Sequence, residues 1–376
     1  MATSNEDIQF IESDTEDETI KTGVSKYNNQ HGVTCYMNSI LHILQQTPLF
    51  MEYISQGLFH TSFHRLFHNG TDKTLIEKTV IFQLFRLFNI SLQNDDTIVF
   101  PEKFRKTIGA KNDMWLEQQQ QDSQELLNFI ISQLEEEIGS RVTYLPGSNY
   151  CEGSDLTIEE SLVKIIGTYS WFRFQSREYS PLKSMFNGLI ETTYKCICCG
   201  AKNINVEPYL TFSVSIPNHG QNKTVSLYDC LDNFTNEEQL DENNKMNCDM
   251  CGLKNRSIAK NMIWKAPKIL VIHFKRFKLN NNGSQHKIMN PVTYPINDLD
   301  ITSYIHPTNR VETKYDLFGA NIHLGSNINF GHYISFVKNV INNKWFVYND
   351  ASDLLEIKSS NDLQNSNAYM LFYYRR

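Results

Sequence analysis

Two Cys-x-x-Cys pairs constrain the fold of this chain more than any other feature of its sequence. The first pair is Cys196 with Cys199, the second is Cys248 with Cys251, and residues 200–247 separate them. Two such pairs supply the four thiolates of a closed tetrahedral zinc site, which is structural rather than catalytic. Because the separation exceeds that of a compact zinc finger, we expect each pair to end its own hairpin, with one zinc ion shared between them.

The excess negative charge lies at the N-terminus. The 376 residues include 42 acidic and 35 basic side chains. Seven of the acids precede Lys21, namely Glu6, Asp7, Glu12, Asp14, Glu16, Asp17 and Glu18. Without those seven, acids and bases are equal in number, so the rest of the chain has no basic excess for binding nucleic acid. We expect residues 1–22 to form an acidic disordered tail.

The sequence predicts an intracellular protein, cytoplasmic or nuclear, that does not enter a membrane. The most apolar stretch, residues 79–92, is too short to span a bilayer and contains Arg86. The first residues lack the basic and apolar segments of a secretory signal, so we expect the cysteines to be reduced. The basic cluster at residues 275–278 is interpreted as the solvated end of a strand.

The spacing of apolar residues predicts helices early in the chain and strands later. Residues 35–46, 74–92 and 122–134 have helical periodicity, and Asp122 fits the N-cap of the last segment. Short β-branched or aromatic segments bounded by Pro, Asn and Gly predict strands at 211–217, 268–274, 331–337, 344–348 and 368–374. Helices followed by strands indicate an α+β fold.

Cys35 is the first candidate for chemistry because it opens an amphipathic helix just after Gly32. The N–H groups and dipole at a helix N-terminus stabilise a thiolate, which would lower the pKa of the thiol and activate it as a nucleophile. The alternative is a buried structural cysteine. Helix position alone leaves the two interpretations evenly balanced.

A second candidate constellation lies near the C-terminus. His332 falls in a predicted strand, and the next strand ends at Asn349 and Asp350. Neighbouring strands can place an imidazole beside an amide or a carboxylate, which gives the base and the orienting group of a cysteine-based triad. Taken alone, a histidine such as His332 is more often structural than catalytic.

Together these segments resemble the ubiquitin-specific protease family of cysteine peptidases, from about Tyr27 to the C-terminus. The matching motifs occur in the family's order: GVTCYMNS around Cys35, QQDSQE at 120–125, FNG at 186–188, PKILVIHFKRF at 267–277, YDL at 315–317, His323, GHY at 331–333, Trp345 and YND at 348–350. The resemblance implies a papain-like fold in one catalytic domain over residues 23–376. Its helical thumb would cover about 23–165, its zinc-tipped β fingers about 190–262, and its β-rich palm the remainder.

The resemblance also implies roles for individual residues. Cys35 would be the nucleophile, His332 the general base, and Asn349 the third triad residue, with Asp350 as the alternative. Family members hold ubiquitin between thumb, palm and fingers while its C-terminal tail enters the cleft. Asp122, with Glu125 in the same helical turn, would bind that tail, whose arginines favour a carboxylate.

One departure from the family pattern concerns catalysis directly. Gln30 stands five residues before Cys35, where the family usually has an Asn that donates to the oxyanion; a glutamine still provides an amide donor. Leu324, where Ser is common, and the additional thiol of Cys198 are lesser departures.

We therefore predict a monomeric deubiquitinase that acts on ubiquitin and ubiquitinated proteins, binds one structural zinc ion, and binds neither nucleic acid nor membranes. A non-catalytic ubiquitin-binding module is the alternative, and a zinc-ribbon protein that binds nucleic acid is a third, disfavoured by the neutral charge balance. A ubiquitin-like modifier is an alternative substrate.

Overall fold

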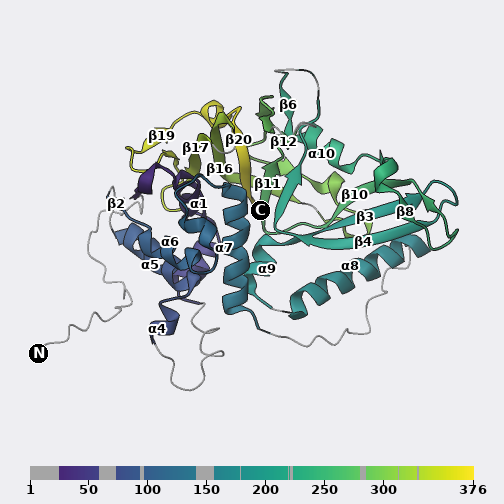
Figure 1. The fold of residues 1–376 in the computed structure, drawn as a ribbon, viewed down its shortest axis with the longest axis horizontal. Helices are drawn as coiled ribbons and strands as arrows, with labels where there is room; N and C mark the ends of the chain where they lie inside the picture. Colours follow the sequence, from purple (N-terminus) through teal and green to yellow (C-terminus); the bar gives the residue numbers. More distant parts are fainter. Residues whose placement is uncertain are drawn as a thin grey trace, which may run out of the picture.

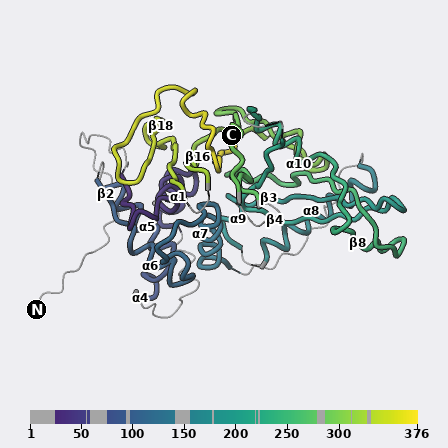
Figure 2. The backbone as a smooth tube through the Cα atoms, turned by 45° about the horizontal axis from the view of Figure 1, so that its top comes forward, coloured from purple at the N-terminus to yellow at the C-terminus, as the bar shows by residue number. Residues whose placement is uncertain are grey.

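A computed structural model describes residues 25–58, 73–93, 97–140, 156–177, 179–218, 220, 223–279, 285–311, 313–327 and 330–376. The expected acidic tail, residues 1–22, lies outside the described residues. Figures 1 and 2 show a helical region on one side, two long hairpins that extend to the other side, and a β-sheet between them.

The helical region surrounds helix α1. Its elements are β1 (Lys26–Tyr27), η1 (Gln30–Gly32), α1 (Cys35–Gln45), α2 (Phe50–Ser55), α4 (Lys73–Ile76), α5 (Val80–Gln93), β2 (Ile98–Val99), α6 (Glu102–Gly109), η2 (Asp113–Leu116) and α7 (Ser123–Ile138). Every residue of α1 is buried, because the helix packs against α7 on one side and against the main sheet on the other. The predicted helix over 35–46 is therefore confirmed, and it ends before Pro48.

The predicted helix over 74–92 is divided into α4 and α5. Helix α5 starts anew at Val80, where the carboxylate of Glu137 in α7 accepts hydrogen bonds from the N–H groups of Val80 and Ile81. Capping the first N–H groups of a helix in this way fixes where the helix begins. The break is thus set by a residue 57 positions away, which local periodicity does not reveal.

Helix α7 has the predicted N-cap. The side chain of Asp122 accepts a hydrogen bond from the N–H of Gln124 at 2.7 Å. Four apolar residues with the predicted helical spacing are buried: Leu127, Ile130, Ile131 and Leu134.

The sequence did not predict the two helices that follow, α8 (Ile158–Arg177) and α9 (Pro181–Phe186), since the last helix expected from periodicity covers 122–134. Helix α8 has apolar residues on both faces, so it lacks the periodicity of a one-sided helix. It lies along β3 and β4 (Figure 1), where Gly167 leaves space for the indole of Trp264. The expected border of the thumb near residue 165 falls within this helix.

The two long hairpins form a four-stranded sheet in the order β4-β3-β10-β7. Its strands are β3 (Gly188–Cys196), β4 (Lys202–Tyr209), β7 (Glu238–Gln239) and β10 (Ser257–Lys265), and a small hairpin of β8 (Met246–Asn247) and β9 (Lys254–Asn255) lies at its end. The first Cys-x-x-Cys pair occupies the turn from β3 to β4, and the second occupies the turn from β8 to β9. The expectation of one hairpin per cysteine pair is confirmed.

The main sheet has eight strands and contains all five predicted segments. Its order is β19-β18-β17-β16-β20-β11-β5, with β15 paired to β16. The strands are β5 (Thr211–Val214), β11 (Ile269–Phe274), β15 (Leu299–Asp300), β16 (Lys314–Asn327), β17 (Phe330–Lys338), β18 (Trp345–Tyr348), β19 (Leu355–Ile357) and β20 (Ala368–Arg375). The α+β prediction is confirmed.

Short elements complete the described chain: α10 (Leu227–Thr235), β6 (Val225–Ser226), β12 (Phe277–Leu279), β13 (Gln285–Lys287), β14 (Val292–Thr293), η3 (Glu242–Asn244), η4 (Thr302–Tyr304), η5 (Pro307–Asn309) and η6 (Ser360–Leu363). Among the described residues, no helix combines the length and apolar character that a membrane span requires.

The main sheet has a hydrophobic core on each face. Ile269 and Val271 of β11 point into the core shared with α1 and α7, whereas Leu270 and Ile272 point into the core on the opposite face. This alternation follows from the two-residue period of a strand. The sheet is thus a buried layer, and α1 is held against it by apolar contacts.

The interpretation of residues 275–278 as a solvated strand end is wrong for Arg276. Lys275 and Lys278 are exposed, but Arg276 is fully buried. Its Nε donates to the carbonyl of Ala368 at 2.6 Å, and its Nη1 donates to the carbonyls of Ile288 and Asn290 at 3.0 Å each. The guanidinium therefore joins the end of β11 to β20 and to the segment after β13.

We expect Arg276→Met to destabilise the protein, because three carbonyls lose a buried charged donor. Leaving buried acceptors unpaired typically costs roughly 1–3 kcal/mol, so the free energy of unfolding should fall by about 2–4 kcal/mol. Urea denaturation followed by circular dichroism measures this change. The exposed neighbour provides the control, since Lys275→Met should change stability by less than about 0.5 kcal/mol. Equal stability of the two variants would show that Arg276 is dispensable.

Candidate active site

Cys35 is the first residue of α1, and its side chain is fully buried. The backbone N–H groups of Cys35 and Tyr36, which have no partner within the first turn, are directed at the sulfur, as is the N–H of Tyr333 in β17. These donors favour a thiolate, but burial outweighs them and raises the pKa of the thiol to about 11. The expected lowering of the pKa is therefore wrong for this state, because the helix terminus is sealed from water. The thiol is neutral at rest.

His332 lies on the strand that packs against Cys35. Strand β17 contacts α1, and the N–H of the next residue, Tyr333, reaches the sulfur. On the other side, β17 pairs with β18 in a register that matches Ser335 with Tyr348. Since the strands are antiparallel, the residues that follow Tyr348 come level with His332.

Asn349 is the direct partner of the imidazole. The Nε2 atom of His332 lies 2.6 Å from Oδ1 of Asn349. An amide oxygen only accepts, so Nε2 is the nitrogen that donates to Asn349, and Nδ1 is left to act as a base. The Asn349 side chain thus fixes both the tautomer and the orientation of His332.

Asp350 takes a different position. Its Oδ2 lies 3.8 Å from Nε2 of His332, beyond hydrogen-bond distance. Its Oδ1 accepts from the amide of Asn38 and its Oδ2 accepts from the amide of Asn29, both at 2.8 Å. Asp350 therefore joins the loop after β18 to α1 and to the segment before it.

Asn29 and Asn38 are site residues that sequence reasoning missed. Asn29 uses its whole amide, because its Oδ1 accepts from the N–H of Thr34 at 2.8 Å while its Nδ2 donates to Asp350. Asn38 lies one helical turn after Cys35 and donates to the same carboxylate. Both asparagines belong to segments already noted around Cys35, but their partner is more than 300 residues away.

Gln30 lies in the tight loop before α1. The backbone there adopts left-handed conformations at His31 and Gly32, and the Gln30 N–H donates to Oγ1 of Thr34 at 2.8 Å. The Gln30 side chain accepts a hydrogen bond from Arg105 of α6, with Nη1 3.3 Å from Oε1. This arginine was not recognised from the sequence.

Asp122 and Glu125 lie at the start of α7 with different surroundings. Asp122 combines the N-cap contact with a hydrogen bond from the hydroxyl of Tyr369 at 2.6 Å, and burial raises the pKa of its carboxyl. Glu125 is exposed on the first turn of the helix. Nearby, Gln120 bridges to Gly331, donating to its carbonyl at 2.6 Å and accepting from its N–H at 2.9 Å. This bridge connects the segment before α7 to the residue before His332.

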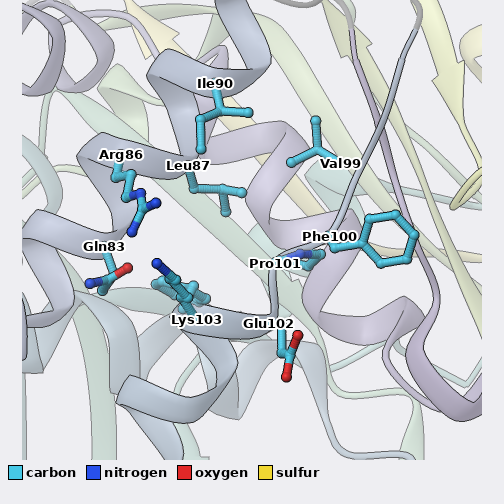
Figure 3. Close-up of a pocket in the computed structure, with 10 residues that line it drawn as sticks. Gln83, Arg86, Leu87, Ile90, Val99, Phe100, Pro101, Glu102 and Lys103 are labelled. Carbon is cyan, nitrogen blue, oxygen red and sulfur yellow. The ribbon is translucent and has the colours of Figure 1, made fainter. Parts of the chain in front are cut away.

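A surface hollow of about 230 Å³ lies elsewhere, between α5 and the start of α6. Figure 3 shows Arg86, Leu87 and Ile90 on one wall and Val99 to Lys103 on the other. None of the candidate site residues lines it. Gln30 lines a second hollow, of about 380 Å³, together with His31 and Arg105, whereas Cys35 is fully buried where α1 meets β17.

The four predicted cysteines come together at the far end of the hairpins. The sulfurs of Cys196, Cys199, Cys248 and Cys251 all lie within 4.8 Å of one another. Two of the separations are 4.0 Å, between Cys196 and Cys251, and 3.6 Å, between Cys199 and Cys248. Tetrahedral coordination with bonds of about 2.3 Å places sulfurs about 3.8 Å apart, so the group fits a single metal ion. Cys198 is exposed and is not part of the group.

The family is decided by comparison with known sequences. The sequence model of the family described as "Ubiquitin carboxyl-terminal hydrolase" matches residues 27–373. The chain belongs to this family. The resemblance predicted from the motifs is confirmed over nearly the whole chain.

Relatives within the family are considerably longer. Ubiquitin carboxyl-terminal hydrolase 2 of Homo sapiens is 32% identical over 343 residues, which cover 91% of this chain and 54% of the relative. Ubiquitin carboxyl-terminal hydrolase Usp2 of Drosophila melanogaster is 30% identical over 351 residues, which cover 92% of this chain and 34% of the relative. This chain spans about half the length of the first of these relatives and a third of the second.

Solved structures confirm the fold. One chain of the SAGA Ubp8/Sgf11/Sus1/Sgf73 DUB module bound to ubiquitin aldehyde superposes with a TM-score of 0.67 and 24% identity, over 95% of this chain and 70% of that chain. A yeast SAGA DUB module gives a TM-score of 0.67 and 24% identity, over 97% of this chain and 71% of that chain. The predicted fold of a ubiquitin-specific protease is confirmed.

Proposed function

We propose that this chain is a cysteine-type deubiquitinase that hydrolyses the peptide or isopeptide bond after the C-terminal Gly of ubiquitin. The observation that carries the proposal is the His332–Asn349 pair, with His332 next in sequence to Tyr333, whose N–H reaches the buried thiol of Cys35, in a member of the ubiquitin carboxyl-terminal hydrolase family. A related fold is known bound to ubiquitin aldehyde. One chain supplies every residue of the candidate site, so a monomer is sufficient.

In the proposed reaction, Cys35 attacks the carbonyl carbon of the ubiquitin glycine. His332 takes the thiol proton as the new S–C bond forms, and it returns that proton to the amine as the C–N bond breaks. The product is a thioester on Cys35, which water hydrolyses with His332 again as the base. A thiol that is neutral at rest requires such a base, and this agrees with the raised pKa of Cys35.

The surroundings of the triad suggest how substrate is held. We infer that the helical region is the thumb, the two long hairpins are the fingers and the main sheet is the palm. The ubiquitin tail would then approach the start of α7 and β17, which the hydrogen bonds between Gln120 and Gly331 hold together in this structure. Glu125 is exposed and free to meet an arginine of the tail, whereas Asp122 would do so while still capping α7.

Intact-mass analysis with ubiquitin carrying a C-terminal electrophile tests the proposed function. We expect the wild-type chain to gain the mass of one ubiquitin and Cys35→Ala to gain none. If wild type binds ubiquitin without forming an adduct, the chain is a non-catalytic ubiquitin-binding module. An adduct formed only with a ubiquitin-like modifier would correct the substrate.

Two single variants distinguish the roles of Asn349 and Asp350. Asn349 contacts His332 directly, so Asn349→Ala should lower kcat by about 10²-fold or more, comparable to the loss of other orienting groups. Asp350 acts through Asn29 and Asn38, so Asp350→Ala should lower thermal stability as well as activity. Steady-state kinetics on a ubiquitin C-terminal fluorogenic amide, together with melting curves, measure both effects. Near-full turnover by Asn349→Ala would reverse the assignment.

We propose that Cys196, Cys199, Cys248 and Cys251 hold one structural zinc ion. The supporting observation is the fit of the four sulfurs to tetrahedral coordination. When bound, zinc would cross-link the β3–β4 turn to the β8–β9 turn and stabilise the fingers.

Metal analysis of purified variants tests the zinc site. Cys248→Ser should lose the metal and weaken ubiquitin binding, because a structural zinc ion contributes on the order of 10 kcal/mol to folding its site. Cys198→Ser is the matched control and should keep one zinc ion per chain. An unchanged zinc content in Cys248→Ser would refute the assignment.

A further inference from the structure

We propose that Arg105 is a positioning residue that determines which end of the Gln30 amide is available to the reacting carbonyl. The inference rests on the proposed function, since it concerns the negative charge that develops when Cys35 attacks an acyl carbon. It assigns a role to a residue of α6 that none of the sequence motifs around Cys35, His332 or the cysteine pairs includes.

Arg105 is held rigidly within the helical region. Its side chain is 6% exposed. Its Nε donates to the carbonyl of Trp115 at 3.1 Å, and its Nη2 donates to the carbonyls of Leu116 and Glu117 at 3.2 and 2.9 Å. These carbonyls end the η2 turn, so three fixed acceptors orient the guanidinium plane. The remaining nitrogen, Nη1, therefore points in a defined direction.

That direction leads to Gln30. The Nη1 of Arg105 lies 3.3 Å from Oε1 of Gln30. A guanidinium has donors and no acceptor, so only the oxygen end of the amide can face it. The chemistry of the two groups thus assigns the orientation of the Gln30 amide. The Nε2 donors of Gln30 are consequently directed away from Arg105.

The Gln30 backbone is fixed next to the helix that begins at Cys35. Its N–H donates to Thr34 Oγ1 at 2.8 Å, and its carbonyl accepts from the N–H of Val33 at 3.2 Å. The side chain is one methylene longer than the usual Asn at this position, so it has one more torsion to restrict. The hydrogen bond from Arg105 to the Gln30 oxygen restricts these torsions before the reaction begins. Less side-chain entropy is then lost when the amide donates to the oxyanion.

The cation also strengthens the donor end of the amide. A positive charge at the carbonyl oxygen polarises the amide, and hydrogen bonds in series reinforce one another in a partly buried site. We infer that Nε2 of Gln30 and the backbone N–H of Cys35 together donate to the oxyanion. Arg105 does not contact substrate, and its contribution passes through Gln30.

A double-mutant cycle tests this role on the full chain. Wild type, Gln30→Ala, Arg105→Met and the double variant are compared on a ubiquitin C-terminal fluorogenic amide, with kcat and KM measured separately. Loss of an oxyanion donor typically costs roughly 10²–10³ in kcat, so we expect Gln30→Ala to fall by about that factor. Arg105→Met should lower kcat at least tenfold with KM within twofold. In the Gln30→Ala background the same change should alter kcat by less than twofold.

Three controls separate positioning from folding. Arg105→Lys keeps the positive charge near Gln30 and should therefore recover part of the kcat that Arg105→Met loses. Lys106→Met removes an exposed neighbouring charge on α6 and should keep kcat within twofold. Labelling of Cys35 by ubiquitin with a C-terminal alkyne forms a vinyl thioether without an oxyanion, so it should proceed in both Gln30→Ala and Arg105→Met.

The outcomes are distinguishable. An equal loss of kcat from Arg105→Met in both backgrounds would overturn the proposal, because Arg105 would then act independently of Gln30. A kcat that stays the same or rises in Arg105→Met would also overturn it, since Arg105 would be holding Gln30 away from the carbonyl. If the wild-type chain neither turns over the amide nor is labelled at Cys35, the proposed function is wrong. That result is distinct from a failure of the double-mutant cycle, in which wild type is active.

Discussion

The packing of α1 against β17 is the contact on which the candidate site depends. Helix α1 is buried along its whole length between α7 and the main sheet. This burial brings Cys35, near the start of the chain, to the backbone of Tyr333. Apolar burial of this extent is the main stabilising term in a core. The position of the thiol is therefore fixed by the same contacts that hold the helical region on the sheet.

A polar network makes this packing specific. Asp350 accepts from Asn29 and Asn38 with both carboxylate oxygens, and its backbone has a left-handed conformation, with φ of 49°. Its neighbour Asn349 is thereby directed toward His332. One carboxylate thus links the segments that carry the thiol to the loop that orients the base. Losing the carboxylate would remove the acceptor of the Asn29 Nδ2 group and leave the Asn38 Nδ2 group only the carbonyls of Tyr27 and Asn28, at 3.3 and 3.2 Å.

Cys35 and the four clustered cysteines differ in how deeply they are buried. Burial raises the pKa of the Cys35 thiol to about 11 and keeps the thiol protonated. The proposed reaction therefore requires a general base. The four clustered cysteines lie at the end of the hairpins, where Cys196 is buried, Cys248 and Cys251 are half-buried and Cys199 is exposed. Their sulfurs are drawn together by hairpin turns rather than by a core. The proposed metal site and the candidate active site therefore depend on different parts of the fold.

The sequence alone determined much of this protein. Periodicity identified α1, α7 and five of the eight strands described in the main sheet, because each buries one face or lies in a buried layer. Spacing identified the four cysteines as candidate metal ligands, because the turn within each Cys-x-x-Cys segment brings its two thiols together. Periodicity did not predict α8, because the apolar residues of that helix lie on two faces. It also did not predict the start of α5, because Glu137 of the distant helix α7 caps it. Tertiary structure also decided the burial of Arg276 and the raised pKa of the Cys35 thiol. It determined that Asn349 is the partner of His332 and that Arg105 contacts Gln30. Each of these depends on distances between segments far apart in the chain, and on exclusion of water, which no local pattern of residues encodes.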